Sequence, residues 1–468
     1  MPDRIPKLVA ICGLVFAPLM LAFLALTRPG YFTSQIYLGG LFLLEFLFAA
    51  LWMYRRVFFP LVIVAFLLAG VNLPLYSFWV AGRWVFLGVG ALAGAVIMLK
   101  DRNHRIGGFH ALAIFTVLSG LVSAAVCRYT GFSLLKVLSL LLLFAYTATG
   151  ARLAVAGRES RFFSGLLTGC EIFVGATTLF YLAGIEIMGN PNSLGAVMGV
   201  VAAPILLWGG LLDDSPPVRH RRFVFFGIAM FLVFYSESRA GIVAGTLACG
   251  LLCVALRRYK LLAQGVCLIL ILVAASSILD PQVLPSIVDS ILYKGKDPTL
   301  GVLHSRESPW EGAEDSIRKH PWFGSGFGVT DNGQDASSHL STFETNESIS
   351  RENGSSYLTI LTWVGFVGVA PFLLLLLAVL LRVVRTLLWM LNTGSPSHPA
   401  VPLAIVIFAA LIHAGFEDWL FAPGYYLCVF FWSLAFILVD FAPWVPLPSF
   451  SAPWRPRVAR VSSFSPIR

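Results

Sequence analysis

Long apolar runs separated by short polar stretches occupy most of the chain. A helix needs about 20 consecutive apolar residues to cross a bilayer, and runs of about this length recur from the N-terminus to residue 441. The pattern predicts an all-α integral membrane protein with about 14 transmembrane helices. We place these helices near residues 8–27, 35–54, 57–76, 80–99, 107–127, 133–150, 162–185, 193–212, 222–236, 239–256, 261–279, 357–381, 401–416 and 419–439.

The composition excludes a soluble fold. Of the 468 residues, 58% are hydrophobic and only 12% are charged, and the mean hydropathy is +0.82. A soluble domain carries about 25% charged residues. The net charge is +9, but the basic residues lie at the ends of apolar runs. There they fix topology and meet anionic headgroups, so nucleic acid is not an expected partner.

The basic residues also predict the orientation. With the N-terminus inside, most Lys and Arg residues fall in the inside segments along the whole chain, as the positive-inside rule requires. Both termini are then cytoplasmic, and one long polar loop lies outside, before the twelfth span. The predicted parts are the bundle of spans 1–11 (1–279), the outside loop (280–356), spans 12–14 (357–441) and a cytoplasmic tail (442–468).

Two arginines, Arg128 and Arg239, fall at outside span ends and break this charge bias. Either their side chains reach the headgroup region, or they face an anionic ligand. Both interpretations stay open at this point.

The outside loop contains one predicted helix, in which Ser308 is the N-cap, Pro309 takes the first position and Pro321 helps to end the last turn. A Gly-rich run at 324–328 follows. This run is either a flexible hinge or a backbone that approaches a ligand closely.

The loop ends in a polar cluster directly before the twelfth span. A helix that begins there points its N-terminus outward, which favours anion binding. Glu352 could act as a base and Arg351 as a phosphate ligand. The alternative is simple capping of the helix by Asn353 and Ser355.

Several short motifs, taken in order along residues 120–370, resemble the O-antigen ligase and O-antigen polymerase superfamily of bacterial envelope glycan assembly. The motifs are Asn190-Pro191-Asn192, Ser238-Arg239-Ala240-Gly241, Arg306 with Trp310, His320-Pro321-Trp322-Phe323-Gly324-Ser325-Gly326-Phe327-Gly328, Glu352-Asn353-Gly354-Ser355-Ser356-Tyr357-Leu358 and Gly365-Phe366-Val367-Gly368.

This resemblance implies a GT-C-like helical bundle in the bacterial inner membrane with a large periplasmic loop. It implies a metal-independent glycosyltransferase without a cofactor, which moves a glycan from a polyprenyl-pyrophosphate carrier to an acceptor glycan. Membrane lipids are expected partners, and other polysaccharide-assembly proteins are candidate partners.

The resemblance also assigns site residues. Many members have His where this chain has Glu352, which favours a polymerase of exopolysaccharide or O-antigen over a ligase acting on lipid A-core. Glu352 is the first candidate base, and His339 and His320 are the alternatives. The candidate substrate-binding residues are Arg128, Arg239, Arg306, Arg351, Asn192 and Glu417. A transporter of lipid-linked saccharides is the competing class.

Overall fold

The computed structural model describes an all-helical chain. It describes residues 4–28, 35–71, 76–100, 107–188, 190–212, 215–279, 304–329 and 353–444, with a few isolated positions besides. Within these residues there is no strand. The helices are α1 (Arg4–Thr27), α3 (Gln35–Trp52), α4 (Tyr54–Leu68), α5 (Tyr76–Lys100), α6 (Gly108–Val126), α7 (Thr130–Tyr146), η1 (Thr147–Ala151), α8 (Arg152–Val155), α9 (Glu159–Leu182), α10 (Pro191–Ala196), η2 (Val197–Ala202), α11 (Ala203–Leu212), α12 (Pro216–Tyr235), α13 (Arg239–Ala255), α14 (Tyr259–Leu279), α16 (His304–Lys319), α17 (Ser356–Thr393), α18 (Ala400–His413) and α19 (Tyr426–Phe441).

The helices have the length and composition of membrane spans. In the described part of the chain, seven helices are long and apolar enough to cross a membrane, and five shorter helices are also apolar. Each range predicted from the sequence overlaps a helix. The structure therefore confirms an all-α membrane protein, whereas the number of crossings stays a prediction.

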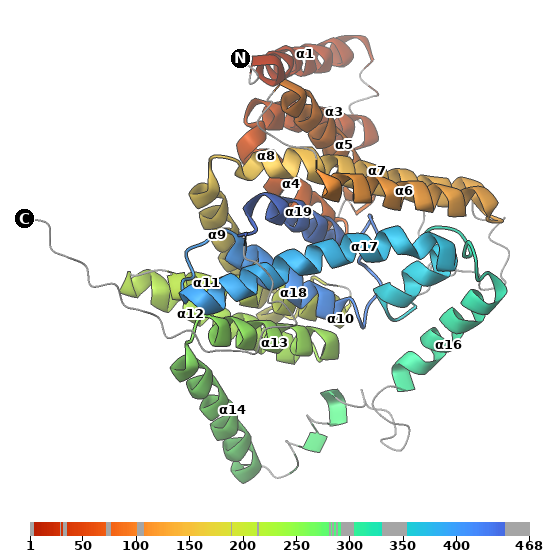
Figure 1. Cartoon of the computed structure of the whole chain (residues 1–468). Helices are drawn as coiled ribbons and strands as arrows, with labels where there is room; N and C mark the ends of the chain where they lie inside the picture. The colour runs from red at the N-terminus through yellow and green to blue at the C-terminus, as the bar shows by residue number, and fades with distance from the viewer. Residues whose placement is uncertain are drawn as a thin grey trace, which may run out of the picture.

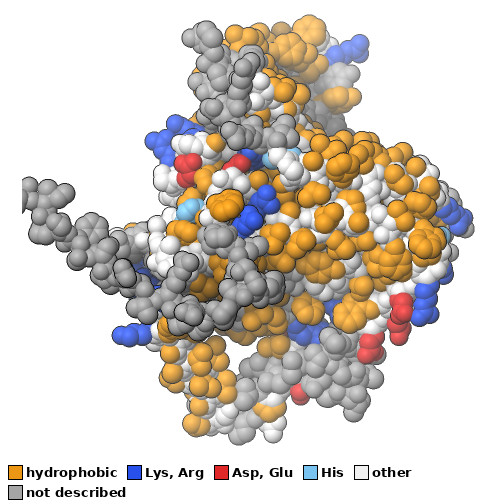
Figure 2. All heavy atoms as spheres, in the orientation of Figure 1, with side chains coloured by type: hydrophobic (Ala, Val, Ile, Leu, Met, Phe, Trp, Pro, Cys, Tyr) orange, Lys and Arg blue, Asp and Glu red, His pale blue; other side chains and the backbone are white. Residues whose placement is uncertain are grey.

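Large apolar side chains cover the outside of the bundle, as Figure 2 shows for one face. On α14, for example, Leu268 is 57% exposed and Ile271 is 62% exposed. Exposed apolar surface of this extent is unfavourable in water. Lipid tails are as apolar as leucine, so the same surface is compatible with a bilayer.

The continuous helix formed by α10, η2 and α11 lies directly against α13. A Cβ added at Gly199 would come within 2.4 Å of the carbonyl oxygen of Gly241, and one added at Gly195 within 2.2 Å of the Ser238 Cβ. Small residues four apart let two membrane helices approach closely. This packing sets the beginnings of α10 and α13 side by side.

The long helix α17 runs through the middle of the bundle and contacts α6 (Figure 1). It is broken at Gly365, whose φ of 65° favours glycine. The loop after α16 fills the break: the Phe366 N–H donates to the Pro321 carbonyl (2.8 Å), and the Ser325 N–H donates to the Thr362 carbonyl (2.9 Å).

The Gly-rich run 324–328 packs against this break in α17. A Cβ at Gly324 would lie 2.3 Å from the Trp363 carbonyl carbon, and Gly324 has a φ of 74°. Gly324 thus permits close approach to the backbone of the chain itself, while a Cβ at Gly326 would meet the Cys127 side chain and one at Gly328 the Lys136 side chain. The close approach that one of the two interpretations held is to the chain itself.

The predicted start of the loop helix was wrong. The helix α16 begins at His304 and includes Pro309 in its interior, so Ser308 is not its N-cap. Pro309 is the sixth residue of α16, so its missing N–H removes one hydrogen bond that a helix interior otherwise makes. The predicted end is confirmed, with Arg318 and Lys319 in the last turn.

Candidate active site

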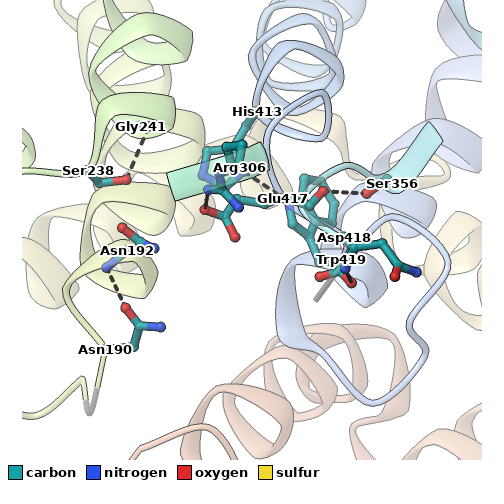
Figure 3. Close-up of polar contacts among 11 residues, drawn as sticks. Asn190, Asn192, Ser238, Gly241, Arg306, Ser356, His413, Glu417, Asp418 and Trp419 are labelled. Carbon is teal, nitrogen blue, oxygen red and sulfur yellow. Dashed lines mark hydrogen bonds and ion pairs between the residues drawn. The ribbon is translucent and has the colours of Figure 1, made fainter. Parts of the chain in front are cut away.

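Three helices, α10, α13 and α17, begin at the same end of the bundle. The Asn190 side chain caps α10 by accepting a hydrogen bond from the Asn192 N–H (2.8 Å). The Ser238 hydroxyl caps α13 by accepting one from the Gly241 N–H (3.3 Å). Figure 3 shows both caps beside a group of polar side chains. The starts of helices carry partial positive charge and suit an anion.

Arg306, near the start of α16, lies in the middle of this group. Its Nη2 donates to Glu417 Oε1 at 2.5 Å, and the two side chains are only 17% and 11% exposed. Arg239, the first residue of α13, is near enough to Arg306 for the two guanidinium groups to repel each other. An anion bound by both would relieve that repulsion. Arg239, Arg306, Glu417, His413 and Trp419 are together termed the arginine cluster.

His413, the last residue of α18, is 2% exposed and interacts electrostatically with Arg306. The Trp419 indole N–H donates to its Nδ1 (2.9 Å). Because an indole N–H only donates, Nδ1 is unprotonated, which assigns the proton of the neutral ring to Nε2. In the described part of the chain Nε2 has no hydrogen-bond partner. The cluster therefore contains a buried donor without an acceptor.

The start of α17 is fastened to the loop between α18 and α19. The Ser356 hydroxyl donates to the Glu417 carbonyl (2.6 Å) and accepts from the Leu420 N–H (3.1 Å). The Asn353 N–H donates to Asp418 Oδ2 (2.9 Å). These bonds fix the backbone at 353–356 beside Glu417. Ser355 takes the N-cap position without a side-chain cap bond, so the predicted capping by its hydroxyl is not seen.

The helix α16 packs on this same segment through Gly354. A Cβ at Gly354 would lie 3.3 Å from the Trp310 Nε1 and 3.4 Å from the Arg306 Cδ, and its φ is 68°. The Trp310 indole nitrogen is buried, and no described residue accepts a hydrogen bond from it. Arg306 is thus positioned by a contact between α16 and the residues that precede α17.

The structure brings together Arg306, Glu417 and Asn192 at this end of the bundle (Figure 3), and Arg239 interacts electrostatically with Arg306. Sequence reasoning missed His413. The available signal was a single ionisable residue within an apolar span, which is often functional.

Other predicted residues are placed elsewhere or not described. Arg128 lies at the exposed turn between α6 and α7, 5.6 Å from the ring centre of Tyr129. His320 is exposed beyond the end of α16, about 21 Å along the helix axis from Arg306 at 1.5 Å per residue. The predicted residues outside the described part are Arg351, Glu352 and His339.

The sequence predicted that the protein has no metal site. Across the described ranges, no group of three or more His, Cys, Asp or Glu side chains could hold a metal ion. Metal independence itself stays a prediction.

Comparison with known proteins identifies the central part of the chain. Residues 224–373 match a protein-family model described as O-antigen ligase, and none of the curated proteins matches the chain. The matched segment contains Arg239 and Arg306, but not His413 or Glu417. The family indicates glycan transfer of the ligase or polymerase type, with a lipid-linked saccharide and an acceptor glycan as substrates. The match supports the resemblance predicted from the sequence, and residues 224–373 are similar to the O-antigen ligase family.

Proposed function

We propose that the protein transfers a glycan from a polyprenyl-pyrophosphate carrier to a saccharide acceptor, and that it polymerises repeat units of exopolysaccharide or O-antigen. The reaction takes place at the periplasmic face of the bacterial inner membrane. The chain crosses the membrane fourteen times, with both termini in the cytoplasm, as the distribution of Lys and Arg favours.

The observation that carries this proposal is that Arg239, at the start of α13, interacts electrostatically with Arg306, near the end of the bundle where three helices begin. A leaving pyrophosphate develops negative charge as its bond to the sugar breaks. Arginines bind phosphate oxygens in pairs and stay charged. Donors positioned in advance stabilise such charge without reorganising. Arg239 and Arg306 are the residues that we assign to this role.

The proton of the acceptor needs a base, and we assign Glu352. The acceptor oxygen attacks the anomeric carbon while the bond from that carbon to the pyrophosphate oxygen breaks. Polyprenyl pyrophosphate leaves, and the hydroxyl proton passes to the carboxylate. The other acid–base groups of the cluster are less suited. Glu417 is paired with Arg306, and the Trp419 donor leaves the neutral His413 with a proton on Nε2, so it donates there.

The first test is polymer synthesis in cells that carry Glu352→Gln, with the level of the membrane protein measured in parallel. The matched control is Glu311→Gln, because Glu311 is exposed on α16. We expect loss of polymer and accumulation of lipid-linked repeat units, with normal amounts of protein, for Glu352→Gln alone. Normal polymer would remove Glu352 as the base and shift the assignment to His339 or His320.

Two measurements separate the alternatives: the cell experiment distinguishes polymerase from ligase, and a transfer assay with purified protein distinguishes enzyme from transporter. If the protein is a ligase, cells that carry Glu352→Gln would accumulate finished lipid-linked polymer and leave lipid A-core unmodified. If the protein is a transporter, the purified protein would transfer no glycan when it is given a lipid-linked donor and an acceptor. Transfer by the purified protein therefore decides between enzyme and transporter.

A further inference from the structure

A cavity of 470 Å³ lies within the apolar part of the bundle, between α4, α9, η2 and α19. Ligand pockets have volumes of about 300–1,000 Å³. Apolar side chains line most of it, among them Phe59 and Ile63 of α4 and Phe430 of α19. The proposed transfer reaction makes no use of this cavity.

Two glycines of α9 keep the cavity open. Gly165 and Gly169 lie one turn apart on its wall, and a Cβ added at either would meet nothing within 4 Å. By contrast, Gly199 and Gly241 are places where two helix backbones touch. The glycines of α9 therefore leave empty space along the wall of the cavity rather than making a close helix contact.

One end of the cavity is cationic. Arg56, Arg158 and Arg161 line it there, with Arg158 half-buried and the other two exposed. At 1.5 Å per residue, the lining extends about 16 Å along α4 from Arg56 to Leu67 and about 18 Å along α9 from Arg161 to Phe173. No Asp or Glu is among the described residues of the lining. The cavity thus combines an apolar groove with a positively charged mouth.

We propose that the cavity binds an anionic phospholipid of the cytoplasmic leaflet, with its phosphate at the three arginines and one acyl chain along Gly165 and Gly169. Basic pockets between membrane helices on the cytoplasmic side bind anionic headgroups, and arginine binds phosphate through paired hydrogen bonds. The choice of leaflet rests on the orientation in the proposed function. The lipid chemistry follows from the lining alone.

The polyprenyl carrier is the other lipid that could enter, and its polarity would be reversed. Its pyrophosphate would lie at the arginine cluster, on the side where Tyr426 donates from its hydroxyl to the Ser193 carbonyl (3.2 Å). Its tail would then point toward Arg56, Arg158 and Arg161 and leave them without a phosphate. The charged mouth favours the phospholipid.

The test measures which lipid stays bound. The full-length protein is reconstituted in bilayers with equal amounts of phosphatidylglycerol, phosphatidylethanolamine and a polyprenyl phosphate, released into mild detergent, and weighed with its bound lipid by native mass spectrometry. One variant carries Arg56→Gln with Arg161→Gln. Its control carries Arg219→Gln with Arg258→Gln, two exposed arginines outside the lining. A second variant, Gly165→Leu, fills the groove, and its control is Gly227→Leu on α12, where a Cβ also meets nothing within 4 Å.

We expect the wild-type protein and both controls to retain phosphatidylglycerol in preference to phosphatidylethanolamine. Each arginine near an anionic headgroup contributes about a fivefold change in affinity, so the double arginine variant should lose about 25-fold. Gly165→Leu should lose the bound lipid as well. Equal retention of the two phospholipids by the wild type would overturn the proposal. So would retention of a polyprenyl phosphate that falls in Gly165→Leu but not in the arginine variant. The readout needs no glycan transfer, so it stands if the transfer proposal fails.

Discussion

Two arginine–carboxylate pairs, Arg152–Asp440 and Arg306–Glu417, lie at opposite ends of the bundle. In the first, Arg152 binds both oxygens of Asp440, at 2.7 and 2.6 Å, and its third nitrogen contacts His110 Nε2 at 2.9 Å. In the second, the only contact described between Arg306 and its carboxylate is a single bond of 2.5 Å. The helix α19 joins the two ends, since it begins beside the arginine cluster and carries Asp440 in its last turn.

The difference between the pairs indicates what each can do. Arg152 has a side chain that is 3% exposed, and each of its nitrogens is engaged, so it ties α8 to α6 and α19. Arg306 is near a second guanidinium and a histidine donor that lacks an acceptor. Removing one partner of a saturated buried pair destabilises the fold, because the other charge is left uncompensated. The arrangement around Arg306 supports its proposed role in binding an anionic ligand.

The largest expected effect comes from Arg306→Gln. The loss of one positioned electrostatic contact lowers a rate by about 10²–10³-fold, or about 3–4 kcal/mol in the barrier. We expect a loss of glycan transfer of this size, measured with purified protein and a lipid-linked donor. Arg318→Gln, which removes an exposed arginine of the same helix that pairs only with Glu314 in the described part, should keep full activity. Equal losses in both variants would contradict the special role of Arg306.

The matching change at the other end is Arg152→Met. It leaves the Asp440 carboxylate without its partner, and breaking such a pair costs about 3 kcal/mol or more. Since Asp440 is 33% exposed, we take the lower end of that range. We expect a lower thermal midpoint and less protein in the membrane, with unchanged transfer per folded molecule. The double change Arg152→Met with Asp440→Leu should recover stability, and a failure to recover would show that the pair is more than a packing element.

A smaller effect is expected from Arg239→Lys, which keeps the charge but loses the planar fork. A hydrogen bond to a charged group contributes about 1.5 kcal/mol or more, so transfer should fall about tenfold. The measurement is the rate at saturating donor, compared with Arg239→Gln, which should fall further. Activity equal to wild type in both variants would remove Arg239 from the proposed phosphate site.

The sequence placed Arg239 at the outside end of a predicted span, where it breaks the charge bias. The Ser238 and Asn190 caps are local contacts over two or three residues, but they were recognised only in the structure. The rest depends on contacts between distant segments. Arg306 and Glu417 are 111 residues apart, and the role of His413 is visible only with Trp419 and Arg306 in place. The Gly-rich run was ambiguous because its partner, the break in α17, lies about 40 residues further along the chain.

The smallest effect tests whether Trp419 acts through His413. Trp419→Phe removes the indole N–H that sets the histidine tautomer, and one such hydrogen bond contributes about 1 kcal/mol, which is about fivefold in rate. If the tryptophan only positions the histidine, then Trp419→Phe should have no further effect in a His413→Asn background, because neighbouring residues that act together are not additive. A purely structural tryptophan would lower stability equally in both backgrounds and leave the rate per folded molecule unchanged. The double-mutant cycle, measured as transfer rate beside the thermal midpoint, therefore distinguishes a histidine held for the reaction from one that merely fills the end of α18.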